Sequence, residues 1–157
     1  MDSSNQLIKI VACDGSVAMV DRKLAEMSMT IKHQLEEIKG NEVHLSMESI
    51  TSRILEKIVA FLEHYEKGFP VIAEQNKYTT NYLTEWDKSF IGQMMDGSQE
   101  ELKMLFEITK AANYLDIKYL LDICCASIAN EIKSKTPEEV KCKFSLTADS
   151  KLASGAC

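Results

Sequence analysis

The segment from Ile117 to Ile132 constrains the fold most strongly, because apolar residues occupy more than half of its helical circumference. Its apolar positions are Ile117, Leu120, Leu121, Cys124, Cys125, Ile128 and Ile132. Such a helix is covered either by the core of its own chain or by a partner. Only one short helix and a polar tail follow it, so little of the chain is left to cover its second face. We therefore expect a partner that binds in the helix-in-groove manner.

The N-terminal part has the pattern of a β-hairpin that is followed by a helix and one further strand. Two apolar runs rich in β-branched residues, at 7–13 and 16–20, flank Asp14-Gly15, which is typical of a type I′ hairpin turn. A helix is predicted over 28–38 and a short strand over 42–45. These elements predict a small sheet with helices packed against it.

From about residue 50 the apolar residues recur every three or four positions, which is typical of helices. Residues 71–83 are polar and irregular and are expected to form an exposed loop, and the small polar residues of 145–157 are expected to be loosely ordered. Two capping boxes, at Ser98 and Thr136, mark helix starts. The predicted helices are 50–65, 84–90 with Gly92 as its end, 98–112, 117–132 and a short helix from Pro137. The fold class is therefore α+β.

The bulk composition argues against several classes of partner. The net charge is -6 and no run of Lys and Arg occurs, so we expect neither nucleic-acid nor membrane-surface binding. Five cysteines are an odd number at spacings that suit no disulfide framework, which favours reduced thiols in the cytoplasm and nucleus. The sequence has no signal-peptide pattern and no apolar run of transmembrane length.

The sequence contains no recognisable catalytic pattern. Nucleotide-binding glycine motifs and the nucleophile elbow are absent. His33, His44 and His64 fall on three different predicted elements, whereas zinc ligands cluster at short spacings, so no metal and no cofactor are expected. A cysteine nucleophile would need a base and an orienting group, and the sequence offers neither. We expect a protein that is not an enzyme.

Several motifs resemble one family. Residues 111–122 read Ala-Ala-Asn-Tyr-Leu-Asp-Ile-Lys-Tyr-Leu-Leu-Asp, which closely resembles the signature of the S-phase-kinase-associated adaptors, the subunits that bind F-box proteins in SCF ubiquitin ligases. Residues 135–140 resemble the segment that follows this signature in the family. Trp86-Asp87-x-x-Phe90 and Thr30-Ile31-Lys32 match as well. The resemblance covers roughly residues 6 to 145.

The resemblance implies a BTB/POZ-type core over residues 6–116, a helical F-box-binding extension over 117–145 and a polar tail over 146–157. It implies an adaptor that bridges F-box substrate receptors to a cullin scaffold for ubiquitin-dependent protein degradation. Val43, Asn113 and Tyr114 match positions that contact the cullin N-terminal domain. The positions implied for F-box binding are Ile117, Leu120, Leu121, Cys124, Cys125, Ile128, Ile132, Pro137, Val140 and Phe144.

Two departures from the family pattern bear on function. The family usually has an acidic loop before the Trp-Asp motif, but residues 71–83 contain one acid, Glu74. It also usually ends in an acidic helix with a Trp that closes over the F-box, and no second Trp follows Phe144. This predicts weaker or narrower F-box binding. The alternatives are a BTB-type self-associating module and an elongin-C-like adaptor with a divergent partner.

Overall fold

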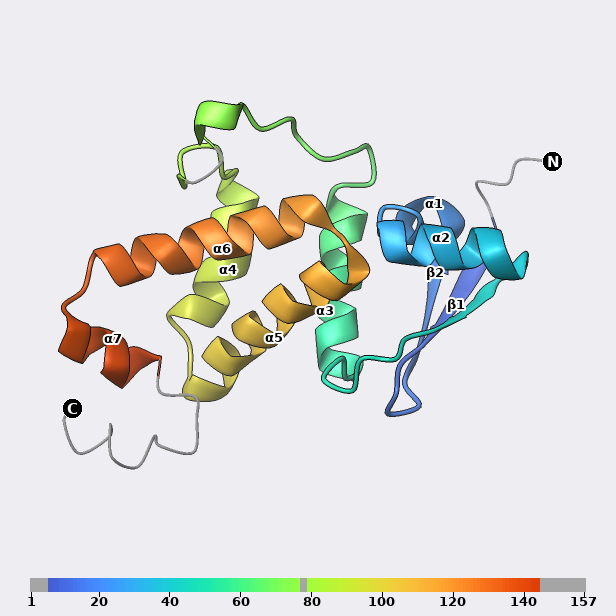
Figure 1. Cartoon of the computed structure of the whole chain (residues 1–157), viewed down its shortest axis with the longest axis horizontal. Coiled ribbons are helices and arrows are strands. Elements are labelled where there is room, and N and C mark those ends of the chain that lie inside the picture. Colours follow the sequence, from blue (N-terminus) through green and yellow to red (C-terminus); the bar gives the residue numbers. More distant parts are fainter. Residues whose placement is uncertain (1–5, 77–78, 145–157) are drawn as a thin grey trace. The chain divides into compact units, whose positions relative to one another are not determined.

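The computed structural model describes residues 6–76 and 79–144 (Figure 1). The chain divides into two compact units. The first comprises Met1–Val71 with Glu107–Leu121, and the second comprises Ile72–Phe106 with Asp122–Cys157. The boundary expected between residues 116 and 117 lies within the first unit.

The first unit contains a three-stranded sheet of strand order β2-β1-β3. The strands β1 (Leu7–Val11) and β2 (Val17–Asp21) are antiparallel, and β3 (Glu42–His44) lies parallel to β1. The predicted hairpin and third strand are confirmed.

The turn between β1 and β2 differs from the type I′ prediction. Val11 pairs with Val17, so five residues connect the strands, and of the Asp-Gly pair only Gly15 has a positive φ, at +88°. The Asp14 carboxylate instead accepts a hydrogen bond of 2.9 Å from the backbone N–H of Ser16. The turn is therefore organised by an Asx-type contact, which a two-residue type I′ loop does not contain.

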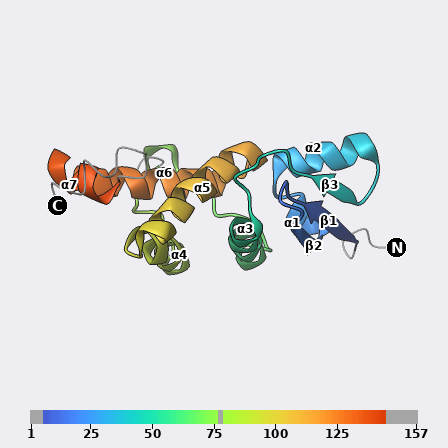
Figure 2. The ribbon, with the colours of Figure 1, turned by 90° about the horizontal axis from the view of Figure 1, so that it is seen from below.

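Three helices pack against the sheet of the first unit. They are α1 (Arg22–Ala25), α2 (Met29–Ile38) and α3 (Ser52–His64). Contacts join α1 and α3 to β2, and α2 to β3, as Figure 2 shows for α2. The alternating pattern of the strands directs Ile8, Ile10, Val20 and Val43 into the core, where each is at most 4% exposed. Burial of these side chains and of the α3 face forms the hydrophobic core of this unit.

The second unit is helical. Its elements are η2 (Glu74–Asn76), α4 (Glu85–Met95), the first part of α5 (Gln99–Leu115), most of α6 (Lys118–Lys133) and α7 (Pro137–Lys143). The predicted helices are confirmed, except that α4 continues through Gly92 to Met95. No helix among the described residues is long and apolar enough to span a membrane.

Two capping boxes fix the starts of helices in the second unit. Thr84 and Asp87 form one at α4, and Thr136 and Glu139 form the other at α7, where Pro137 occupies the first turn. In each box the threonine hydroxyl accepts a hydrogen bond from the N3 backbone while the N3 carboxylate accepts one from the N-cap backbone. The start of α7 predicted from Thr136-Pro137 is therefore confirmed.

Candidate partner-binding surfaces

Tyr114 lies at the surface of the first unit near the end of α5. Its hydroxyl is 3.0 Å from the backbone nitrogen of Ser46, which donates to it, and 2.9 Å from the Ser46 hydroxyl. The Thr30 hydroxyl donates to the backbone oxygen of Tyr114 at 2.7 Å. These bonds hold the ring half-buried, next to the exposed side chain of Asn113. We call Ser46, Asn113 and Tyr114 the Tyr114 surface.

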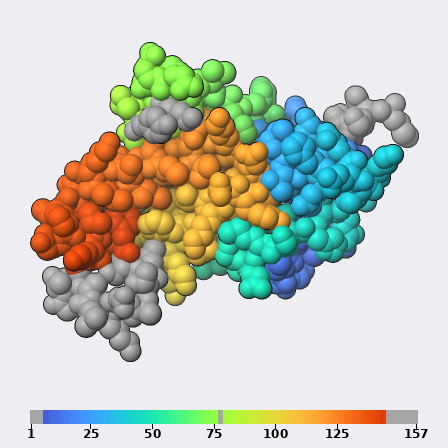
Figure 3. Space-filling model, in the orientation of Figure 1, coloured from blue at the N-terminus to red at the C-terminus, as the bar shows by residue number. Residues whose placement is uncertain are grey.

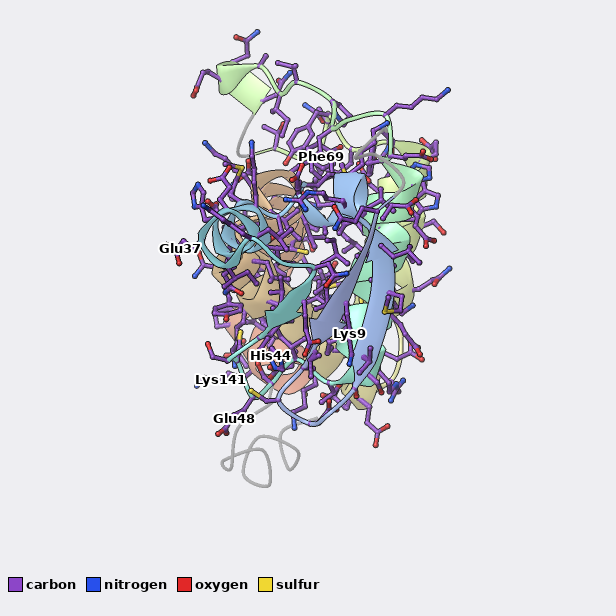
Figure 4. All side chains as sticks on the ribbon, turned by 90° about the vertical axis from the view of Figure 1, so that its right-hand side faces the viewer. Lys9, Glu37, His44, Glu48, Phe69 and Lys141 are labelled. Atoms are coloured by element: carbon purple, nitrogen blue, oxygen red, sulfur yellow. The ribbon has the colours of Figure 1, made fainter. Side chains whose placement is uncertain are left out.

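Val43 does not belong to this surface. Val43 is 1% exposed and pairs in register with Ile10, so its side chain belongs to the core of the free chain. Its neighbours Glu42 and His44 point outward instead, with 2.7 Å between the carboxylate and the imidazole Nε2. Figure 4 shows Lys9 and His44 on the strands. Side chains alternate between the two faces of a strand, so Val43 could have been placed inward if the face of one neighbouring residue of the strand had been known.

The structure divides the apolar positions of α6 between two faces. Ile117, which precedes the helix, and Leu120 and Cys124 within it are completely buried. These three predicted partner residues therefore belong to the core. The accessible apolar positions are Leu121, Cys125, Ile128 and Ile132, which follow a helical spacing and which we call the α6 stripe. Ile132 is 43% exposed.

The short helix α7 presents the remaining predicted residues. Pro137 is exposed, and Val140 and Phe144 are half-buried. None of the residues of α7 is fully buried. The Phe144 ring packs edge-on against Phe106 of α5, with 5.7 Å between the ring centroids. In Figure 3 the surfaces of α6 and α7 are both open to view. Accessible apolar side chains on two successive helices fit a protein partner better than a small substrate.

An ion-pair cluster that the sequence did not predict joins α7 to α4 and α6. The Lys143 ammonium lies 2.7 Å from Glu131 and 3.6 Å from Asp96, and Lys135 lies 3.2 Å from Glu131. The hydrogen bond from Lys143 is the largest cause that holds the pKa of the Glu131 carboxyl below its ordinary value. The contacts of Phe106 with Phe144 and of Lys143 with Glu131 were not predicted, because no local sequence pattern indicates such pairs.

The titratable groups near these surfaces show no arrangement for nucleophilic chemistry. Burial raises the pKa of the Cys125 thiol, and the negative charge of Asp122 raises it further, whereas activation of a thiol requires a lowered pKa. Cys13, Cys124 and Cys125 are free thiols. Among residues 6–76 and 79–144, no group of three acidic, histidine or cysteine side chains could hold a metal ion.

A pocket of about 280 Å³ lies in the second unit between α4 and α6. Its walls combine apolar side chains, such as Leu83 and Ile91, with polar ones, such as Ser127 and Asn130. Its carboxylates from Asp96 and Glu131 are already paired with Lys143. The pocket therefore does not bring together an unpaired acid and base for catalysis.

The fold is that of an α+β POZ domain joined to a helical C-terminal region. Two family descriptions match the chain: "Skp1 family, tetramerisation domain" over residues 6–67 and "Skp1 family, dimerisation domain" over residues 118–151. The second match extends past the described residues.

Curated relatives agree with this family. The chain is 37% identical to "E3 ubiquitin ligase complex SCF subunit sconC" of Talaromyces stipitatus, over 83% of this chain and 78% of the relative. It is 34% identical to "Suppressor of kinetochore protein 1" of Schizosaccharomyces pombe, over 90% of this chain and 86% of the relative. It is 35% identical to "S-phase kinase-associated protein 1 homolog" of Tetrahymena thermophila, over 95% of this chain and 87% of the relative. The chain belongs to the Skp1 family.

Proposed function

We propose that this chain is the adaptor subunit of an SCF-type E3 ubiquitin ligase, in which it bridges F-box substrate receptors to a cullin scaffold. Membership of the Skp1 family and relatives named as SCF subunits support this function. The structural observation that carries it is the α6 stripe, an accessible apolar face on a helix whose opposite face is already buried. Membership of the Skp1 family favours the adaptor over a self-associating BTB module and over an elongin-C-like protein.

The F-box would pack on the α6 stripe together with Pro137, Val140 and Phe144 of α7. A stable interface of this kind buries about 1,000 Å² or more and has apolar anchors at its centre. Ile128 and Ile132 supply such anchors because a partner could bury the area that they now expose. Ile117, Leu120 and Cys124 would contribute indirectly, since they hold α6 in the core.

The cullin N-terminal domain would bind the Tyr114 surface. The hydrogen bonds between Ser46 and the Tyr114 hydroxyl fix the side chain before any partner arrives, and the Thr30 bond holds its backbone, so little side-chain entropy is lost on binding. Tyrosine combines a large apolar ring with a polar hydroxyl and is enriched at the centres of interfaces. Glu42 and His44 on β3 replace the buried Val43 as candidate neighbours.

The chain would act as a scaffold and not as an enzyme, without a cofactor, in the cytoplasm and nucleus. Holding the substrate receptor and the ubiquitin-transferring machinery in one assembly converts an encounter between separate molecules into a step within a complex. The chain's own side chains would take no part in bond making. Substrate choice would then belong to the F-box protein.

The F-box surface is tested by Ile128→Glu. The variant should fold, because Ile128 is only half-buried in the free chain, but F-box binding would bury an unpaired carboxylate. We expect at least about 100-fold weaker binding of a recombinant F-box domain in calorimetry. The matched control is Asn130→Glu, which adds the same side chain at an exposed position of the same helix. Unchanged affinity of Ile128→Glu would contradict the assignment.

The cullin surface is tested by Tyr114→Ala. Loss of the ring should weaken binding of the recombinant cullin N-terminal domain by at least about tenfold, which corresponds to an interface hot spot. Tyr114→Phe separates the ring from the hydroxyl, which bonds to Ser46. Circular dichroism should show that both variants stay folded. A Tyr114→Ala variant that is folded and binds the cullin domain normally would remove this surface from the proposal.

A further inference from the structure

The short helix α7 presents part of the proposed F-box surface, and none of its residues is fully buried. Its Thr136–Glu139 capping box and Pro137 favour the helical conformation itself. They do not attach the helix to the rest of the unit. A helix of this length is marginal when isolated in water, so its position depends on contacts at its ends.

Two successive residues at the C-terminal end of α7, Lys143 and Phe144, contact other helices of the unit. Lys143 places its ammonium between Glu131 of α6 and Asp96 at the end of α4, and Phe144 packs against Phe106 of α5. The 2.7 Å distance between Lys143 and Glu131 is that of a charge-assisted hydrogen bond. The ion pair thus connects α7 directly to the helix that bears the α6 stripe.

The burial of this ion pair distinguishes it from ordinary surface pairs. The side chains of Lys143 and Glu131 are each 22% exposed, whereas those of Lys88 and Glu85 in α4 are 53% and 95% exposed. Exposed pairs contribute little to stability because water screens them and ordering the side chains costs entropy. Removing one partner of a more enclosed pair costs more, and loss of the Lys143 charge would leave Glu131 with Lys135 in place of two cations.

We propose that Lys143 and Glu131 are positioning residues that clasp α7 against α6 and so keep Val140 and Phe144 in place for a partner. The inference rests on the proposed function as far as that partner is an F-box. The clasp itself is a property of the free chain. Lys135, which follows the end of α6, reinforces it by an ion pair of 3.2 Å with the Glu131 carboxylate.

The first test concerns the free chain. Lys143→Met keeps the aliphatic stem and removes the charge, and Lys143→Arg keeps the charge. We expect Lys143→Met to speed amide hydrogen exchange in α7 by about tenfold relative to the unmodified chain, and Lys143→Arg to restore protection. The matched control, Lys88→Met, removes an exposed ion pair of the same type and should leave exchange in α7 unchanged. Unchanged exchange in Lys143→Met would overturn the clasp.

The second test uses a recombinant F-box domain that binds the unmodified chain. We expect Lys143→Met to weaken its binding about tenfold, with Lys143→Arg and Lys88→Met within about threefold of the unmodified chain. If exchange in α7 increases but affinity does not change, the clasp exists without a positioning role, and the inference is wrong. If the unmodified chain binds no F-box domain, the proposed function fails, and the exchange experiment still decides whether the clasp exists.

Discussion

Glu131 shows how one side chain can connect elements that the sequence keeps apart. Its carboxylate accepts a hydrogen bond from Lys143 of α7 and lies 3.2 Å from Lys135, in the connection between α6 and α7. The Asp96 carboxylate lies 3.6 Å from the same Lys143 ammonium. The hydrogen bond from Lys143 is the largest influence on the pKa of Glu131 and lowers it, while burial acts in the opposite direction.

The titration of Glu131 should therefore report on the clasp. Because its folded pKa is below the ordinary value of 4.5, its stabilising contribution is complete above pH 4.5 and is lost as the pH falls through the folded value. Carboxyl-carbon NMR of the unmodified chain should give a midpoint below 4.5. Lys143→Met should move this midpoint upward, toward the ordinary value. A midpoint that does not move would show that Lys143 does not hold the carboxylate in solution.

Single residues were harder to predict from the sequence than the elements that contain them. Tyr114 and Asn113 were found through a motif, but the motif could not reveal that Ser46 would hold the tyrosine hydroxyl. Val43 was assigned to a surface because it matches a family position, although its side chain is buried. Such facts depend on contacts between distant parts of the chain, which a local pattern does not contain.

The helix α6 illustrates why its existence could be predicted and its orientation could not. A period of 3.6 residues and a wide apolar surface identified the helix correctly. However, the same surface contains two overlapping stripes, and only the packing of neighbouring helices decides which of them is buried. In the structure Leu120 and Cys124 are buried in the core, whereas Cys125 and Ile128 of the α6 stripe remain accessible.

The adjacent cysteines of α6 give a direct test of this division. Cys124→Asp would place a charge at a fully buried position and should lower the free energy of unfolding by roughly 3 kcal/mol or more, in urea denaturation. Cys125→Asp changes an exposed position, so its effect on stability should stay within about 0.5 kcal/mol. It should nevertheless weaken F-box binding. Equal destabilisation by the two variants would mean that α6 is oriented differently.

Across the whole molecule, the Tyr114 surface lies in the first compact unit, whereas the α6 stripe, apart from Leu121, lies in the second. Ser46, Asn113 and Tyr114 lie in the first unit, and Cys125, Ile128 and Ile132 lie in the second. Each surface is fixed by contacts within its own unit: the Ser46–Tyr114 bonds in one and the Lys143–Glu131 pair in the other. An adaptor needs this separation because both partners must be bound at the same time for the bridge to exist.

The separation predicts that the two binding reactions are nearly independent. Tyr114→Ala should lose affinity for the cullin domain but keep its F-box affinity, and Ile128→Glu should do the reverse. In the double variant, the two free-energy losses should add to within about 0.5 kcal/mol, as for sites without shared contacts. Light scattering with both domains present should detect a ternary complex with the unmodified chain and only binary complexes with either variant. Loss of both affinities from one substitution would show instead that the units are coupled, and that each surface depends on the other for its shape.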